Sequence, residues 1–194
     1  MKFYRLASAI GGMGLLAGGL SSCLKAPEYS TTPSISFNQI QRRRYTPTNV
    51  KEQVLDTISI KINYQDGDGD LGLTADEVAA QPTKYSGRFA KNYFIEPFVK
   101  NKATGKYEAL TTVGVPFPNV YNAGQYNGLY LHPTASTDTK AAPIKGTLTY
   151  TLIPFGLGDI FVPGQTVRFQ VSIADRALNV SNTIMTDSVV IPPR

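Results

Sequence analysis

The residues most able to do chemistry form a short acidic run in which aspartates and glycines alternate. Asp66, Asp68 and Asp70 are separated by Gly67 and Gly69. Three carboxylates that crowd together repel one another unless a cation lies among them, and the glycines let the backbone curl so that the side chains converge. Oxygen ligands of this kind suit calcium. The run therefore predicts a structural calcium site; the alternative is a solvated Asp-Gly turn without an ion.

The spacing of this run approaches that of an EF-hand loop but does not fit it. With Asp66 at the first position, the next two aspartates fall at ligand positions three and five, and Glu77 falls at position twelve. However, Leu71 stands at position six, where an EF-hand requires glycine. Glu77 instead has capping-box spacing with Thr74, which predicts the start of a short helix. We therefore do not expect an EF-hand.

A second loop carries Asp175 and Asn179 between the last two expected strands. In an immunoglobulin-like sandwich, the loops that follow the second strand and the penultimate strand emerge at the same end. The strand ahead of the acidic run would be an early one, and the strand that ends at Ala174 would be the penultimate one. We therefore expect Asp175 or Asn179 to complete the shell of the same calcium ion. The alternative for both residues is an Asx turn that caps a hairpin.

Short segments of alternating apolar and polar residues position these loops. In the segment 56–64, every second residue from Ile58 to Tyr64 is apolar, which is the pattern of a half-buried strand. Pro97 favours an edge position for its own strand. Further strands are expected at 93–99, 107–111, 146–152, 166–174 and 183–191. The expected fold class is all-β, an immunoglobulin-like β-sandwich over residues 34–194.

The N-terminus has the pattern of an export signal. Lys2 and Arg5 precede an uncharged run at 6–20, which is shorter than the roughly 20 residues that a membrane-spanning helix needs. Leu20-Ser21-Ser22-Cys23 resembles the lipobox of bacterial lipoproteins, in which small residues precede the cysteine that is acylated. We therefore expect a signal peptide at 1–22 and a lipid anchor on Cys23. The alternative is an incidental free cysteine.

Composition sets further limits on the mature chain. Residues 23–33 are rich in Pro, Ser and Thr, which predicts a flexible tether. The chain has one cysteine, so the domain must depend on its core or on a metal rather than on an internal disulfide. A formal net charge of +5, spread along the chain, gives no case for nucleic-acid binding. We interpret the basic run Arg42–Arg44 as a solvated patch near the tether.

Two segments together resemble a known family. They are 64–72, with the sequence YQDGDGDLG, and 173–186, with the sequence IADRALNVSNTIMT. Both are similar to cell-envelope lipoproteins of unknown function that are common in Bacteroidota, which combine a lipobox with a D-G-D-G-D-[IL]-G loop and an immunoglobulin-like ending. The resemblance implies attachment to the outer membrane. It does not indicate whether the protein faces the periplasm or the cell surface. It brings no established activity.

The sequence gives little support for an enzyme. His132 is the sole histidine, so a Ser-His-Asp arrangement would have to be built on it alone. A two-carboxylate glycosidase stays open, because only the fold brings its acids together. We expect a structural or binding role without catalysis. The rival function is a carbohydrate- or protein-binding accessory lipoprotein that uses Tyr121, Tyr126 and Tyr130; the alternative for these tyrosines is packing beneath a long loop.

Overall fold

The computed structural model describes residues 28–46, 48, 55–113, 121–132, 141–152, 155–156, 160–161 and 163–192, so the expected signal peptide and Cys23 lie outside the described residues. The strands are β1 (Ser34–Tyr45), β2 (Leu55–Asp66), β3 (Tyr93–Lys100), β4 (Tyr107–Ala109), β5 (Ile144–Thr151), β6 (Phe155–Gly156), β7 (Thr166–Ile173), β8 (Ile184–Met185) and β9 (Val189–Val190). The helical elements are α1 (Ala75–Ala80), the 3-10 turn η1 (Gly87–Ala90) and α2 (Leu110–Val113). In the described part of the chain, no helix is long and apolar enough to cross a membrane.

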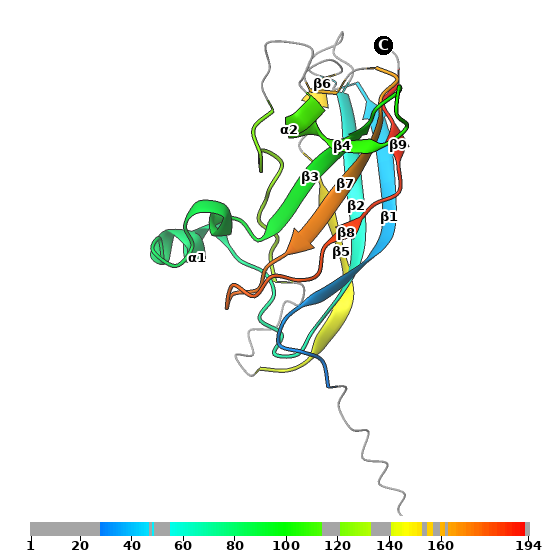
Figure 1. Ribbon diagram of the computed structural model, residues 1–194. Helices are drawn as coiled ribbons and strands as arrows, with labels where there is room; N and C mark the ends of the chain where they lie inside the picture. The colour runs from blue at the N-terminus through cyan, green and yellow to red at the C-terminus, as the bar shows by residue number, and fades with distance from the viewer. Residues whose placement is uncertain are drawn as a thin grey trace, which may run out of the picture.

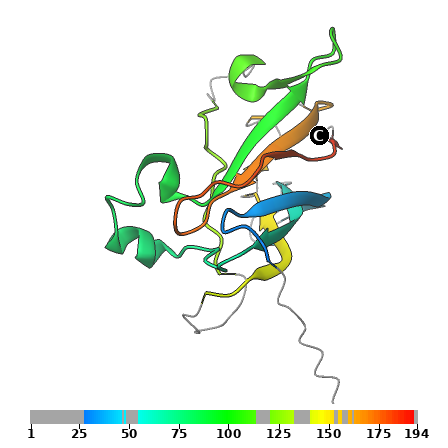
Figure 2. The same cartoon turned by 60° about the horizontal axis from the view of Figure 1, so that its bottom comes forward.

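The strands form two antiparallel sheets that lie face to face, as Figures 1 and 2 show from two directions. The first sheet has the order β1-β2-β5, with β6 also paired to β2. The second has the order β4-β3-β7-β8, with β9 also paired to β7. The sequence predicts an all-β domain, and the structure confirms this in a coarser form: a mostly β fold of two antiparallel sheets with short helical elements.

The hydrophobic core fills the space between the sheets. On β2, Ile58, Ile60 and Ile62 have no exposed surface, and Tyr64 is 7% exposed. The facing residues of β7 are also fully buried: Val167, Phe169, Val171 and Ile173. Burying an apolar side chain of this size contributes roughly 1.5–3 kcal/mol. The period-two patterns of both strands thus predict the inward faces correctly.

Two elements differ from expectation at the ends of the domain. The expected strands do not include β1, whose residues are mostly exposed and polar, and a register shift between Phe37 and Gln39 interrupts its alternation. The strand expected at 183–191 is divided into β8 and β9. Between them, the Thr186 hydroxyl accepts the N–H of Phe169 at 3.0 Å. The Thr186 hydroxyl therefore takes the place of the backbone carbonyl that would accept this N–H in a regular sheet.

The edge position that Pro97 predicts for its strand is wrong, because β3 lies between β4 and β7. The N–H and the carbonyl of Phe169 both form hydrogen bonds with Thr186, on the β8 side of β7. The backbone of Phe169 is therefore directed away from its partner Pro97, and the missing N–H of Pro97 costs no hydrogen bond to β7. The other edge of β3 pairs with β4 only from Phe98 onward. Ahead of Pro97, the Asn127 side chain accepts the N–H of Ile95 at 2.8 Å. A loop side chain thus covers the edge that β4 leaves open, and proline is tolerated because its missing N–H faces that edge.

The basic run is not the solvated patch near the tether that the sequence suggests. Arg42 and Arg44 lie toward the far end of β1 from residues 28–33. Their guanidinium groups reach Asp56 on the neighbouring β2, at 2.7 and 3.1 Å. Asp56 has no exposed surface. Since a buried carboxylate is costly unless it is paired, these two arginines serve to neutralise it.

Candidate metal centre

β2 carries a carboxylate at each end of its buried face. Asp56 and Asp66 both point inward, both have no exposed surface, and the apolar core residues of β2 lie between them. Asp56 is neutralised by two arginines. Asp66 makes no ion pair in the described part of the chain, and its Oδ1 atom is buried without a hydrogen-bond donor. The carboxylate at one end of β2 is therefore neutralised by arginines of the chain, whereas the carboxylate at the other end has no such ion pair among the described residues.

The turn after β2 brings Asp70 back toward Asp66. The Asp66 Oδ2 atom accepts the backbone N–H of Asp70 at 3.1 Å. Gly69 and Gly72 have φ angles of +72° and +95°, which side chains other than glycine rarely adopt. At Gly72 a Cβ atom would also collide with the backbone of His132. Glycine at these two positions lets the acidic run curl tightly.

The second predicted loop lies against this turn. Leu71 and Asp175 form an antiparallel bridge. The N–H of Arg176 donates to the Asp70 carbonyl at 3.3 Å, and the N–H of Ala177 donates to Asp70 Oδ2 at 3.1 Å. The loops after β2 and β7 therefore emerge side by side, as the sequence predicts.

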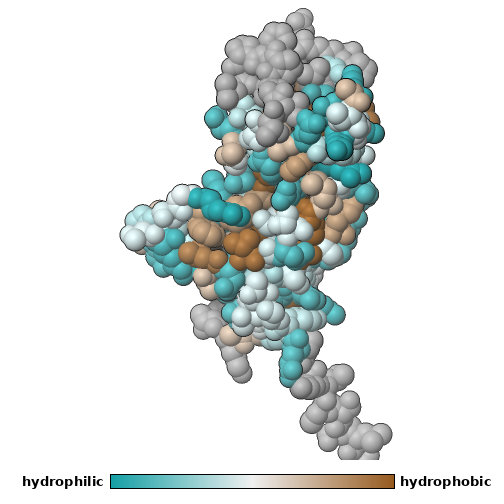
Figure 3. Space-filling view, in the orientation of Figure 1, coloured by the Kyte–Doolittle hydropathy of each residue, from teal (hydrophilic) through white to brown (hydrophobic). Residues whose placement is uncertain are grey.

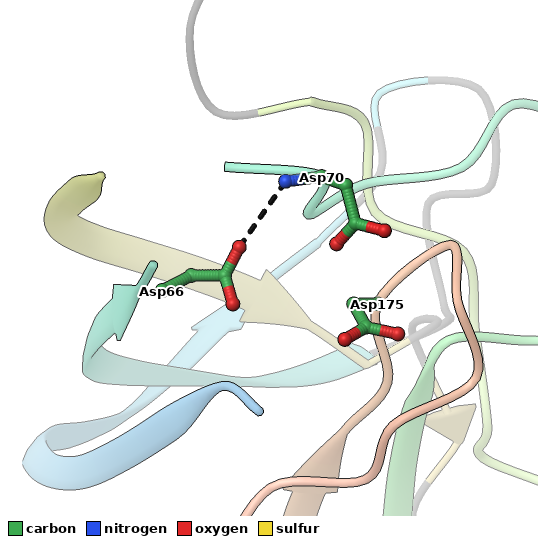
Figure 4. Close-up of side chains that lie close together, drawn as sticks. All are labelled: Asp66, Asp70 and Asp175. Atoms are coloured by element: carbon green, nitrogen blue, oxygen red, sulfur yellow. Dashed lines mark hydrogen bonds between the residues drawn. The ribbon is translucent and has the colours of Figure 1, made fainter. Parts of the chain in front are cut away.

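Three carboxylates converge between these loops. Oxygen atoms of Asp66, Asp70 and Asp175 all lie within 4.8 Å of one another, close enough to hold one metal ion. Figure 4 shows the side chains turned toward a common space. Asp175 is only 2% exposed, and Asp70 is partly buried. The Oδ1 atoms of Asp66, Asp68 and Asp70 are all buried without a hydrogen-bond partner. Such oxygens are the ones that a cation would coordinate.

The carboxylates are poorly neutralised by the protein itself. Burial, together with the charges of Asp68 and Asp70, raises the pKa of Asp66 to about 7. Burial and the charges of Asp175 and Asp68 raise the pKa of Asp70 to about 6. Burial also raises the pKa of Asp175. The cluster therefore favours either protons or a bound cation at neutral pH.

The nearest arginine is turned to another partner. The Arg176 guanidinium donates to the Gly72 carbonyl at 2.9 Å and forms an ion pair with Glu77, also at 2.9 Å. Its charge lowers the pKa of Asp70 by less than burial and the neighbouring aspartates raise it. Glu77 closes the predicted capping box, because its carboxylate accepts the Thr74 N–H at 2.8 Å and its own N–H donates to the Thr74 hydroxyl at 3.1 Å. Glu77 therefore caps the N-terminus of α1, as expected.

Asp68 and Asn179 stand at the margin of the cluster. Asp68 is outside the group of three, although its charge raises the pKa of both Asp66 and Asp70. Asn179 donates its backbone N–H and its side-chain amide to the Asp175 carboxylate, at 2.7 and 2.8 Å. This is the Asx turn that the sequence left as the alternative. Its effect is to orient the Asp175 carboxylate, and a ligand role for Asp68 or Asn179 stays a prediction.

Contacts from distant segments shape the site, and spacing in the sequence gives no signal for them. The His132 ring Nε2 lies 2.9 Å from the Gly69 carbonyl oxygen, and the Tyr130 carbonyl accepts the N–H of Leu73 at 2.9 Å. On the other side, the Ser30 carbonyl accepts the N–H of Gly67 at 2.8 Å. The end of the expected tether is therefore part of the folded structure.

The tyrosines proposed as a ligand-binding surface are buried instead. Tyr121, Tyr126 and Tyr130 are 5%, 9% and 5% exposed. The Tyr126 ring is stacked on both Tyr121 and Phe161, and the Tyr130 hydroxyl donates to the Ala174 carbonyl. Because other protein groups occupy these rings, the expectation of an exposed tyrosine surface is wrong. They pack in the core, which was the alternative.

The same loop does line a cavity, on the outer face of the second sheet. The cavity has a volume of about 370 Å³, with Phe94, Glu96 and Gln170 at its floor and Arg88 at its wall. The Arg88 guanidinium lies 4.0 Å from the centre of the Phe94 ring, and the Tyr121 hydroxyl donates to Glu96 at 2.9 Å. Figure 3 shows apolar residues gathered in this region, between α1 and the second sheet. The lining of the cavity thus combines an aromatic ring with amide groups and two opposite charges.

Comparison with known proteins identifies no matching family model, no matching curated protein and no matching solved structure.

Proposed function

We propose that this protein is a lipid-anchored envelope protein whose β-domain binds one calcium ion between the loops after β2 and β7, in a structural or binding role without catalysis. The observation that carries the proposal is the contrast along β2. Asp56 is buried with two arginines, whereas Asp66 is equally buried among other aspartates and has an unpartnered oxygen. A buried carboxylate without a counter-charge is costly. A bound cation supplies that charge.

The ligand set favours calcium over other metals. The converging groups are all carboxylates, whereas zinc and the softer transition metals favour histidine and cysteine. Magnesium requires a small, near-octahedral shell, whereas calcium accepts more ligands in less regular geometry. A group of several aspartates from two loops suits the larger, less regular shell of calcium. Extracellular calcium modules bind with dissociation constants of about 10⁻⁴–10⁻³ M, which is sufficient for a structural ion outside the cell.

The strand order supports an immunoglobulin-like sandwich for the domain. If β1, β2 and β5 are taken as strands A, B and E, then β4, β3, β7 and β8 correspond to C′, C, F and G. In variable immunoglobulin domains the B–C and F–G loops lie at one end of the sandwich. The proposed calcium site is built from these two loops, so it would occupy the position in which antibody domains carry binding loops.

Calcium is expected to raise the melting temperature of the protein. At a free concentration about ten times the dissociation constant, binding to the folded state alone contributes about 1.4 kcal/mol. For a domain of this size that corresponds to roughly 3–6 °C. Thermal melting followed by circular dichroism in calcium and in chelator measures the difference. Identical melting curves in the two conditions would refute the calcium site.

The lipid anchor is proposed from the lipobox at Leu20–Cys23. Replacing Cys23 with Ala removes the thiol that is acylated, so the protein is expected to leave the membrane fraction. Fractionation of cells that express Cys23→Ala, with Ser22→Ala as a matched variant that keeps the thiol and a small residue before it, measures the effect. A Cys23→Ala protein that stays with the membrane would rule out the anchor. The proposed location is the outer membrane, on either face.

A second candidate function is recognition of a glycan in the cavity over β3 and β7. The observation that favours it is the combination of a phenylalanine floor with charged and amide groups, which suits a ligand with an apolar face and hydroxyl groups. Binding to a glycan array is the test, and Gln170→Ala should weaken it at least about tenfold through the loss of a buried polar contact. Gln81→Ala, on an exposed turn, is the control. An array without any bound glycan would eliminate this candidate.

A further inference from the structure

The loops that carry the aspartates also hold the first described residues of the chain. We call residues 28–33, which directly precede β1, the docking segment. Its Ser30 carbonyl accepts the N–H of Gly67, between Asp66 and Asp68. The fit is close, since a Cβ atom at Gly67 would collide with the backbone of Tyr29 and Ser30. The acidic run therefore presents its backbone to the docking segment on one side and its carboxylates to the cluster on the other.

The second loop holds the start of β1, directly after the docking segment. Asn182 comes directly after the 175–181 turn, and its side chain binds both backbone groups of Ile35. The N–H of Ile35 donates to Asn182 Oδ1 at 2.8 Å, and Asn182 Nδ2 donates to the Ile35 carbonyl at 2.9 Å. Ile35 is 6% exposed, and Pro33 is also buried. The docking segment and the start of β1 thus bridge the two loops between which the cation would lie.

Both contacts can form together only while the loops keep a fixed spacing. Without a cation, the carboxylates of Asp66, Asp70 and Asp175 repel one another across the gap between the loops. Separation of the loops would move Gly67 away from Asn182. Ser34 and Ile35 stay paired with β2, so the attachment that is lost first is the single hydrogen bond at Ser30. Figure 1 shows the docking segment at the same end of the domain as the turn after β2.

We propose that occupancy of the cation site controls whether the docking segment is attached to the domain. This inference rests on the proposed calcium site and adds a regulatory role to it. The docking segment lies between the domain and Cys23, and each released residue adds up to about 3.5 Å of reach. Calcium therefore shortens and stiffens the connection to the lipid. Loss of calcium lengthens it and frees the domain to tilt.

Cleavage after Tyr29 and exchange of two amide hydrogens test the proposal on the full chain purified in detergent. Chymotrypsin should cut after Tyr29 at least about tenfold more slowly in millimolar calcium than in chelator, because docked backbone is protected. The amides of Gly67 and Ile35, which donate to Ser30 and Asn182, should also exchange more slowly in calcium. Hydrogen exchange followed by mass spectrometry measures both.

A matched pair of variants separates this inference from the calcium site itself. Asn182→Ala removes both hydrogen bonds to Ile35 but leaves all four aspartates and the Ser30–Gly67 contact. The calcium shift in melting temperature should therefore persist, while the difference in cleavage after Tyr29 between calcium and chelator should disappear. Asn38→Ala, an exposed asparagine on β1, should keep both. A calcium shift in melting with no change in cleavage or exchange would overturn the docking proposal alone. Absence of the melting shift would overturn the calcium site as well.

Discussion

Replacing Asp66 with Asn is expected to weaken calcium binding by about 100-fold and, in chelator at pH 7.5, to make the domain more stable than the wild type. Affinity falls because a central charged ligand is lost. Stability rises because Asp66 lies fully buried among aspartates, so its charge is a cost when no cation is present. The asparagine still accepts the N–H of Asp70, and its amide can donate to the neighbouring carboxylates.

Calcium titration by calorimetry and melting in chelator measure these two effects. Asp187→Asn is the matched control, since it makes the same chemical change at an exposed position and should alter neither quantity. The two expected effects, weaker calcium binding and higher stability in chelator, have opposite signs, which distinguishes the loss of a ligand from a general folding defect. A variant that merely disturbs folding would lower both calcium affinity and stability. If Asp66→Asn binds calcium like the wild type, Asp66 is not a ligand.

The metal-free protein is expected to lose stability as the pH rises from 5 to 8, by about 5–10 °C in melting temperature. In the folded state the pKa is about 7 for Asp66 and about 6 for Asp70. Both exceed the usual aspartate value of about 3.9. Protons therefore bind the folded state more tightly than the unfolded one. Their stabilisation is greatest near pH 4 and is lost as the pH rises through about 6–7.

Millimolar calcium is expected to reverse this trend. Calcium binds the charged carboxylates and competes with protons, so its stabilisation grows over the same pH interval in which the metal-free protein weakens. Melting curves at pH 5, 6, 7 and 8, in chelator and in calcium, measure both slopes. Asp66→Asn should flatten the profile in chelator because it removes a group whose pKa is raised to about 7. Parallel profiles with and without calcium would contradict the model.

The two ends of β2 show how one strand solves the same electrostatic problem in two ways. At Asp56 the counter-charges are covalent parts of the chain, Arg42 and Arg44. At Asp66 no such ion pair is present among the described residues, and one carboxylate oxygen is buried without a partner. We therefore expect this end of the domain to respond to calcium and to pH. The responsive end is also the one to which the docking segment is attached.

The sequence by itself determined the features that depend on neighbouring residues. Period-two alternation marked the inward faces of β2 and β7, and the spacing of Thr74 and Glu77 marked the capping box of α1. The alternating aspartates also pointed to the cation cluster. These signals are local because side-chain direction in a strand and the reach of a cap are fixed by backbone geometry over a few residues.

Only the tertiary structure decided which distant groups meet. It paired the basic run with Asp56, buried the tyrosines that the sequence offered as a surface, turned Asn179 onto Asp175, and seated Ser30 on Gly67. A sequence pattern records that a side chain is charged or aromatic. It does not record the partner, because partners are chosen by the packing of two sheets whose contacting residues are far apart in the chain. The carboxylate cluster combines both kinds of information, since Asp66 and Asp70 are close in sequence at the turn after β2, whereas Asp175 comes from a distant loop.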